Sequence, residues 1–498
     1  MAFPSRGCIT CKTRRIKCDS VHPLCGRCQK ASRDCVWDQN QEAGLLFKDE
    51  NAFAQGKPRR PWKSKVQEVS SFVPAKDKAL QFWLDNYVFR DDEIPEFARE
   101  YNHYLIAHRD SAKHNSSLHL ITSAFSHAVF SRVMQSGESI EEAEKLFAQS
   151  IESVQTEIRQ LSQSNIDELL LTTMLMADYK NVMDREGWNR QNQDEVSLLN
   201  PDVTGSRIWK NAYHYDGATD LLRQRQQNRW TSNLLLDRTV RRRLIRVCIL
   251  RGISVPEWIR DGAQFGEEGP VLILDSIMVR VAALRERSLC LFLPKSARFS
   301  TQPHPGDLAA EARSLDAALE VWSAALPEDW RFTTRSDSTP DFTFDGVIHV
   351  YATYGHAAIW CRYNAIRLIV NSIRNRALSV MAQCSSQMLS VAPEQDICLG
   401  KTTSLGTDLC RSIPVFFTSI TVEGNPTGAM ANDNIVHVNQ EIKPKLATLL
   451  AWPLILAINT DNIPEFQKEW LKNKLKSIAN TLGDAILDAA IEQNELMF

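Results

Sequence analysis

Apolar residues recur at steps of three and four over long stretches of the chain after about residue 76. This period is typical of helices that bury one face. The clearest example runs from residue 140 to residue 161, where Ser139 and Glu142 form a capping box at the predicted start. Its apolar stripe consists of Ile140, Ala143, Phe147, Ile151, Val154, Ile158 and Leu161. We interpret the stripe as a face of the internal core, although its spacing would also suit a partner helix.

A second helix is predicted immediately afterwards, starting at Asn165 and Glu168. The short connector Ser-Gln-Ser between the two helices predicts an antiparallel pair. Strand signals are sparse, because we find no long alternating run bounded by Asn-Gly or Asp-Gly turns. Helical patterns of the same style continue in residues 214–224, 305–332, 354–378 and 450–459. We therefore expect residues 76–498 to form a large, irregular all-α helical array.

The longest apolar run, Leu446 to Ile458, predicts a buried helix. Its 13 residues include Pro453 and fall short of the roughly 20 residues that a membrane-spanning helix needs. We therefore expect no membrane partner. The chain opens with Met1-Ala2-Phe3-Pro4 and reaches Arg6 without the apolar stretch of a signal peptide. On this basis we expect its cysteines to meet a reducing compartment.

The charge of the chain is divided between a basic start and an acidic remainder. The whole chain of 498 residues has a formal net charge of −2, but residues 1–65 carry 14 Lys and Arg against 6 Asp and Glu. The remaining residues carry 44 basic against 54 acidic side chains. Clustered positive charge indicates a polyanionic partner, since neutralised phosphates release counterions. A solvated basic tail would show the same charge.

Six of the twelve cysteines lie between residues 8 and 35, and their spacing repeats. Two 11-residue units, "CITCKTRRIKC" and "CGRCQKASRDC", each place cysteines at positions 1, 4 and 11. Each unit offers three thiolates, whereas tetrahedral zinc takes four ligands, so two units with two metals must share a pair of bridging cysteines. The six cysteines are Cys8, Cys11, Cys18, Cys25, Cys28 and Cys35. A disulfide framework or a metal store would not require the basic residues around them.

This segment resembles the fungal binuclear zinc cluster DNA-binding domain, whose six-cysteine spacing it matches throughout. The resemblance also covers Pro23 and the basic run between the second and third cysteines. It implies a small α domain of two short helices around two Zn²⁺ ions, with the first and fourth cysteines as bridges. One zinc would then be held by Cys8, Cys11, Cys18 and Cys25, and the other by Cys25, Cys28, Cys35 and Cys8. Such ligation supplies on the order of 10 kcal/mol of folding free energy in comparable peptides.

The first unit is the better candidate for the DNA-facing half. It carries Lys12, Arg14, Arg15 and Lys17 with no acidic residue, whereas the second carries basic residues beside Asp34. The resemblance implies a short helix that enters the major groove at a CGG-like triplet, with Arg14 and Arg15 on the basic pair that reads bases. We expect Lys12, Lys17 and Arg27 to contact phosphates. His22 is interpreted as a solvated loop residue and not as a ligand.

Residues 37–75 are predicted to be a basic linker between the zinc domain, residues 1–36, and the helical region, residues 76–498. The stretch from Gly56 to Lys65, "GKPRRPWKSK", suits a phosphate contact, a nuclear import signal or an ordinary flexible linker. No heptad pattern runs for three or four repeats, so the linker sequence gives no sign of dimerisation through a coiled coil.

Enzyme signatures are missing from the sequence: we find no phosphate-binding glycine loop, nucleophile elbow or His-Glu-x-x-His pair. The histidines between residues 103 and 127 and the six later cysteines are interpreted as ordinary core or surface residues. The basic cluster from Arg238 to Arg246 is interpreted as a solvated helix face, with an import signal or a DNA contact as alternatives. The acidic and apolar end, residues 483–498, suits a packed helix or an activation segment.

The sequence therefore predicts a nuclear, zinc-dependent transcription regulator of RNA polymerase II genes that is not an enzyme. Its expected partners are double-stranded DNA and the transcription machinery or co-regulators, and a homodimer is left open. Two alternatives from other classes remain. One is a zinc-dependent protein interaction scaffold, and the other is a helical region with small-molecule receptor activity.

Overall fold

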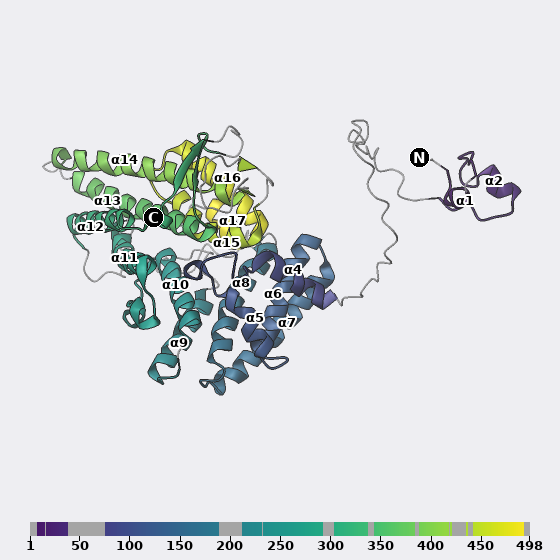
Figure 1. The fold of residues 1–498 in the computed structure, drawn as a ribbon, viewed down its shortest axis with the longest axis horizontal. Coiled ribbons are helices and arrows are strands. Elements are labelled where there is room, and N and C mark those ends of the chain that lie inside the picture. Colours follow the sequence, from purple (N-terminus) through teal and green to yellow (C-terminus); the bar gives the residue numbers. More distant parts are fainter. Residues whose placement is uncertain are drawn as a thin grey trace, which may run out of the picture. The chain divides into compact units, whose positions relative to one another are not determined.

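The chain separates into two compact units, Met1–Ser71 and Phe72–Phe498, which we name the head and the body. The computed structural model describes residues 7–14, 16–37, 75–188, 212–231, 233–291, 303–336, 343–383, 388–417, 419–420, 435–436 and 442–492. The predicted basic stretch Gly56–Lys65 lies outside these residues. Each unit is described by itself below (Figure 1).

The head has two short helices, α1 (Ile9–Thr13) and α2 (Gly26–Lys30). Cysteines take the place of an apolar core, since Cys8, Cys11, Cys25 and Cys28 are fully buried. Thr10 ties the start of the domain to its end, because its Oγ1 donates to the carbonyl of Asp34 at 2.8 Å. A segment this short buries little apolar surface, so its folded structure depends on metal ions bound between the sulfur atoms.

The body is a helical array, which confirms the predicted fold class. Its α-helices are α4 (Ala75–Tyr87), α5 (Asn102–Ser111), α6 (Ser117–Met134), α7 (Gly137–Arg159), α8 (Ile166–Trp188), α9 (Ala212–Gln227), α10 (Leu234–Arg251), α11 (Gly269–Ser288), α12 (Pro305–Ala324), α13 (Tyr354–Ala382), α14 (Met388–Ser412), α15 (Pro444–Ile458), α16 (Glu465–Leu482) and α17 (Ala485–Glu492). Two small antiparallel pairs accompany them, β1 (Thr333–Ser336) with β2 (Val347–Val350), and β3 (Ser419–Ile420) with β4 (Ile435–Val436).

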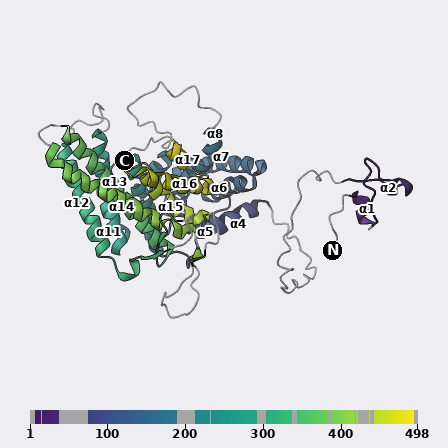
Figure 2. The same ribbon diagram turned by 90° about the horizontal axis from the view of Figure 1, so that it is seen from above.

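The helices of the body form two groups that the C-terminal helices join. Helices α12, α13 and α14 lie side by side (Figure 1, Figure 2), and α13 is buried along most of its length. Helices α4 to α8 form the other group around α6. Helix α15 contacts both α13 and α4, and α17 packs on α8, so one apolar core runs through the whole body.

Helix α7 corrects part of the sequence interpretation. It begins at Gly137, because the Oγ of Ser136 accepts from the backbone N–H of Ser139, so the predicted capping box starts three residues too late. Its buried stripe runs through Ala143, Leu146, Phe147 and Ser150, and α7 packs mainly on α6. In the predicted stripe, Ile151 is 39% exposed and Ile158 is 49% exposed, so the assignment of the whole stripe to the core is wrong.

Helix α10 overturns the prediction of a solvated basic face. Arg241, Arg242 and Arg246 are 0%, 7% and 5% exposed. Each finds a carboxylate at another place in the body: Arg241 binds Glu267 at 2.9 Å, Arg242 binds Asp275 at 3.2 Å and Arg246 binds Glu100 at 2.6 Å. The charge cluster therefore ties α10 to its neighbours, because buried charges are tolerated only when they are paired.

The burial of side chains agrees with two predictions about the C-terminal third of the chain. The apolar run forms α15 with Pro453 inside the helix, and its residues from Leu454 to Ile458 are buried. Leu487 and Ala490 of α17 are also buried, which favours the packed-helix interpretation of this acidic segment. No helix among the described residues has the length and apolar character needed to cross a membrane.

Stability of the body is expected to fall as the pH falls from about 6.5 to about 4. His349 of β2 is 3% exposed and stacks on Phe332, and its burial lowers its pKa to about 4. Between these pH values the unfolded chain binds a proton at this histidine that the folded chain does not bind. The contribution to the free energy of unfolding is therefore complete above the unfolded pKa and is lost as the pH falls toward the folded pKa. His349→Gln should reduce the slope of unfolding free energy against pH by up to about 1.4 kcal/mol per unit.

Chemical denaturation at several pH values between 4 and 7 would measure that slope. His114→Gln, at an exposed position, is the matched control. A slope that is the same in wild type and in His349→Gln would contradict the assignment to His349.

Candidate metal centre and nucleic-acid interface

The six cysteines of the head converge on one point from both units of the repeat. They form two overlapping quartets, Cys8 with Cys11, Cys18 and Cys25, and Cys8 with Cys25, Cys28 and Cys35. Within each quartet the sulfur atoms all lie within 4.8 Å of one another. Cys8 and Cys25 belong to both quartets. Among the described residues, no other group of His, Cys, Asp or Glu side chains is close enough to hold a metal ion.

The distances between the sulfur atoms fit metal ligation and not disulfides. The Sγ atoms of Cys8 and Cys25 are 3.7 Å apart, those of Cys11 and Cys25 3.6 Å, and those of Cys8 and Cys28 3.7 Å. Zinc bound to sulfur at about 2.3 Å in a tetrahedron gives an edge of about 3.8 Å. A disulfide would need about 2.05 Å. All six cysteines are free thiols, and this donor set therefore fits two Zn²⁺ ions with two shared sulfurs.

Backbone donors repeat with the same spacing in both units. The N–H of Cys11 donates to Cys8 Sγ, and the N–H of Cys28 donates to Cys25 Sγ, each at 3.4 Å. The N–H of Cys8 donates to Cys18 Sγ at 3.4 Å, and the N–H of Cys25 donates to Cys35 Sγ at 3.3 Å. Such bonds favour the thiolate, which is the form that binds metal.

The shared pair differs electrostatically from its neighbours. Burial disfavours the Cys8 thiolate, but the Cys11 N–H and the surrounding thiols outweigh it and lower the pKa of Cys8. The pKa of Cys25 is lowered in the same way, with the N–H of Cys28 as the main donor. Burial and neighbouring thiols instead raise the pKa of Cys28 to about 12. The pKa is thus lowered at the two sulfurs that belong to both quartets and raised at Cys28.

Three supporting residues were missed by the sequence interpretation. A side chain at Gly7 would place its Cβ 2.6 Å from the Cβ of Cys18, so only glycine allows residues 7 and 18 to approach this closely. Asp19 accepts from the N–H of Gly26 at 2.9 Å and fixes the start of α2. Trp37 donates to the carbonyl of Pro23 at 2.8 Å and stacks on His22. Of the three, the glycine beside a ligand cysteine was the one readable signal.

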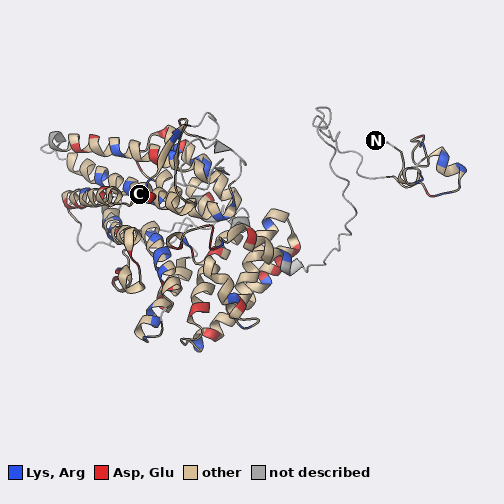
Figure 3. Cartoon of the chain, viewed as in Figure 1, with Lys and Arg blue, Asp and Glu red and all other residues tan. Residues whose placement is uncertain are grey.

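The predicted DNA contacts are described only in part. Arg14, Lys17 and Arg27 are exposed. Arg14 closes the last turn of α1, where its N–H donates to Thr10 O at 3.3 Å, and Arg27 lies on α2, which is partly blue in Figure 3. Arg15 and the side chain of Lys12 lie outside the described residues. His22 is exposed and is absent from both quartets.

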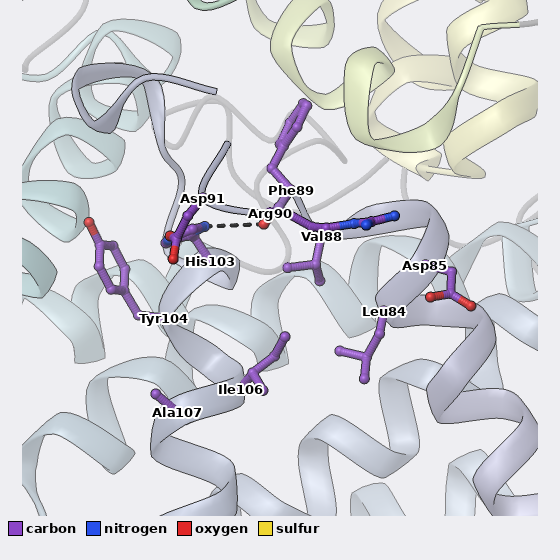
Figure 4. A pocket seen from close by; sticks show the side chains of 10 residues that line it. All are labelled: Leu84, Asp85, Val88, Phe89, Arg90, Asp91, His103, Tyr104, Ile106 and Ala107. Atoms are coloured by element: carbon purple, nitrogen blue, oxygen red, sulfur yellow. Dashed lines mark hydrogen bonds and ion pairs between the residues drawn. The ribbon is translucent and has the colours of Figure 1, made fainter. Parts of the chain in front are cut away.

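The other candidate side chains have structural partners. His103 lies between two acceptors at a hollow of about 580 Å³ lined by α4 and α5: its Nδ1 is 3.2 Å from Phe89 O and its Nε2 is 2.8 Å from an Asp91 oxygen (Figure 4). His114 and His119 contact each other through their rings. The described cysteines of the body, Cys248, Cys361, Cys398 and Cys410, are buried and free. The side chains of Cys290 and Cys384 lie outside the described residues.

Comparison with known proteins gives one family match in the head and partial matches to individual proteins. Residues 6–43 match the fungal Zn(2)-Cys(6) binuclear cluster domain. A stretch of 79 residues is 37% identical to a transcriptional regulatory protein of Schizosaccharomyces pombe, over 16% of this chain and 12% of that protein. A stretch of 75 residues is 37% identical to sterol uptake control protein 2 of Candida albicans, over 15% and 10% of the two chains. A stretch of 80 residues is 39% identical to the transcription activator AMTR1 of Alternaria alternata, over 16% and 10%.

These matches span only about a tenth of each relative's length. No solved structure matches the chain. The head is thus similar to a domain that binds two zinc ions, and its two cysteine quartets are positioned to hold them.

Proposed function

We propose that this chain, whose head matches the binuclear zinc cluster domain, is a zinc-dependent, sequence-specific DNA-binding transcription regulator. The observation that carries the proposal is the pair of cysteine quartets sharing Cys8 and Cys25 inside a domain with exposed Arg and Lys. Transcriptional regulators among the relatives support the same assignment. The finer part of the proposal is a CGG-like triplet read in the major groove, at RNA polymerase II genes in the nucleus.

Each part of the head has a role in this proposal. Cys8, Cys11, Cys18 and Cys25 hold one zinc, and Cys25, Cys28, Cys35 and Cys8 hold the other. Arg14 and Arg15 read bases, while Lys12, Lys17 and Arg27 contact phosphates and set the register. When bound, the zinc ions offset the charge of the thiolates and fold the head.

The domain layout is part of the proposal. Residues 1–36 bind DNA, residues 37–75 link, and residues 76–498 form the regulatory region that contacts co-regulators. Pairing of two copies stays open, because the linker has no heptad pattern.

Selection from random DNA in the presence of zinc tests this function, with the full chain and with residues 1–75 in parallel. One enriched triplet from both proteins would support monomeric reading, with the body serving regulation. Two triplets at a fixed spacing from the full chain alone would assign dimerisation to the body. No enrichment from either protein, together with binding that does not depend on salt, would refute DNA recognition and favour the interaction scaffold.

Two substitutions separate base reading from phosphate contact. Arg15→Ala should relax the choice within the triplet by about 1–3 kcal/mol, because an Arg binds guanine bidentately. Lys12→Ala should weaken binding to every sequence about equally and reduce the slope against salt by about one. Fluorescence anisotropy on matched and mismatched duplexes at several salt concentrations measures both. Equal losses on all sequences from both variants would refute the roles assigned to these residues.

A further inference from the structure

Helices α11 and α12 of the body present an apolar face to solvent. Val321 of α12 is 69% exposed, and no other large apolar side chain among the described residues is more exposed. Ile273 of α11 is 55% exposed. Ala317 and Ala324, one turn before and one turn after Val321, are exposed as well. Exposed apolar side chains that gather on one face are typical of protein interaction surfaces.

A hydrogen bond between the two helices places Ile273 close to Val321. Trp322, the next residue of α12, donates through Nε1 to the carbonyl of Pro270 at 2.7 Å. Ile273 follows Pro270 by three residues, which is about one turn of α11. The two helices lie side by side (Figure 1). The four exposed side chains therefore form one patch, which we name the α11–α12 face.

Two charged side chains, Arg313 and Glu320, border this face along one side of α12. They are seven residues apart, about two turns, so they project from the same side of the helix. Arg313 lies 3.5 Å from Glu394. Glu320 binds Arg367 at 2.6 Å and Lys401 at 2.8 Å. Both side chains stay about half exposed in spite of these pairs, so each can contact a further charge from outside.

The order of the two charges makes the face complementary to a second copy of itself. Around a two-fold axis, two residues of one copy meet each other's counterparts in the other copy. If two α12 helices pack antiparallel about a point between residues 316 and 317, Arg313 of each copy meets Glu320 of the other. A parallel pair would instead place like charges at the same level, so the charges favour the antiparallel arrangement.

We propose that the α11–α12 face pairs two copies of this chain, with the two α12 helices antiparallel about a two-fold axis. Val321 and the exposed alanines form the centre of the contact, Ile273 lies at its edge, and the two Arg313–Glu320 pairs fix its register. The contact is small, and interfaces below about 1,200 Å² in total are typical of weak complexes. The dimer therefore exchanges with the monomer. This surface goes beyond the proposed DNA recognition and does not depend on it, because it lies within the body.

Sedimentation velocity of the full, zinc-loaded chain without DNA tests the proposal. We expect a reversible monomer–dimer equilibrium with a Kd on the order of 10 μM, measured from about 1 to about 200 μM chain. Val321→Glu should raise the Kd about tenfold or more, because it places a charge at the centre of the contact. Val133→Glu makes the same change at the end of α6, where Val133 is also exposed, and should dimerise as wild type does.

A charge exchange between two chains tests the antiparallel register. Arg313→Glu and Glu320→Arg should each weaken the dimer, because each places like charges opposite each other twice. Mixing the two variants should restore dimerisation, since every pair in the mixed dimer is again of opposite charge. Thermal unfolding checks that both variants are folded. The absence of a dimer at any concentration, a dimer that Val321→Glu leaves intact, or a mixture of folded variants that stays monomeric would each overturn the proposal.

Discussion

Replacing Cys25 by serine is expected to remove both zinc ions and DNA binding together. Cys25 belongs to both quartets, and its Sγ also accepts from the N–H of Cys28 at the start of α2. A serine hydroxyl stays protonated at neutral pH and is a poor zinc ligand, so both metals would lose a ligand at once. Metal ligation supplies on the order of 10 kcal/mol of folding free energy in such domains. In the described part of the head the buried cluster consists of cysteines, so apolar packing cannot replace the metal there.

Zinc content per chain by mass spectrometry and DNA binding by anisotropy measure this outcome. Cys11→Ser is the matched control, because Cys11 belongs to one quartet only, and it should retain more zinc than Cys25→Ser. A Cys25→Ser protein that keeps two zinc ions and binds its DNA would rule out the shared ligand.

The second large effect is expected in the body, at Arg241. Its side chain is fully buried and makes three bonds: to Glu267 at 2.9 Å, to the carbonyl of Ile259 at 2.6 Å and to the carbonyl of Arg260 at 2.7 Å. Arg241→Met should reduce the unfolding free energy of the body by about 3–5 kcal/mol, because it leaves a buried carboxylate without its closest partner.

Urea unfolding followed by far-UV circular dichroism measures that loss. Lys145→Met is the matched control, since Lys145 forms an exposed pair with Glu142 at 3.1 Å and exposed pairs contribute about 0–1 kcal/mol. Adding Glu267→Gln to Arg241→Met should recover part of the stability, because no unpaired buried charge then remains. A loss at Arg241 no larger than that at Lys145 would show that this network does not support the fold.

The two predictions describe different ways of holding a fold together. The head relies on sulfur atoms that need a metal, so its stability depends on zinc. The body relies on an apolar core and on ion pairs of α10. Buried pairs join α10 to the loop before α5, to Glu267 and to α11, and a partly exposed pair joins it to α8. Loss of zinc is therefore expected to leave the body folded.

Sequence alone was enough to predict the metal site, because the proposed ligands are local. All six cysteines lie within 28 residues, and a repeat of three thiolates per unit leaves only shared ligation for two tetrahedral ions. The structure then adds Gly7 and Asp19, whose roles depend on close approaches between residues 7 and 18 and between residues 19 and 26. A glycine beside a ligand cysteine is a signal that the sequence offers, whereas the residue type of Asp19 alone does not predict its contact.

For the body, the sequence determined that helices form, and the tertiary structure decided which of their faces are buried. The period of apolar residues in α7 is correct, yet Ile151 and Ile158 are exposed because α6 covers the neighbouring stripe. The arginines of α10 have the pattern of a solvated face, yet they are buried because their carboxylates arrive from as far away as Glu100, 146 residues earlier. A charged side chain requires water or a residue of opposite charge around it. Only the packing of distant elements decides which of the two it has.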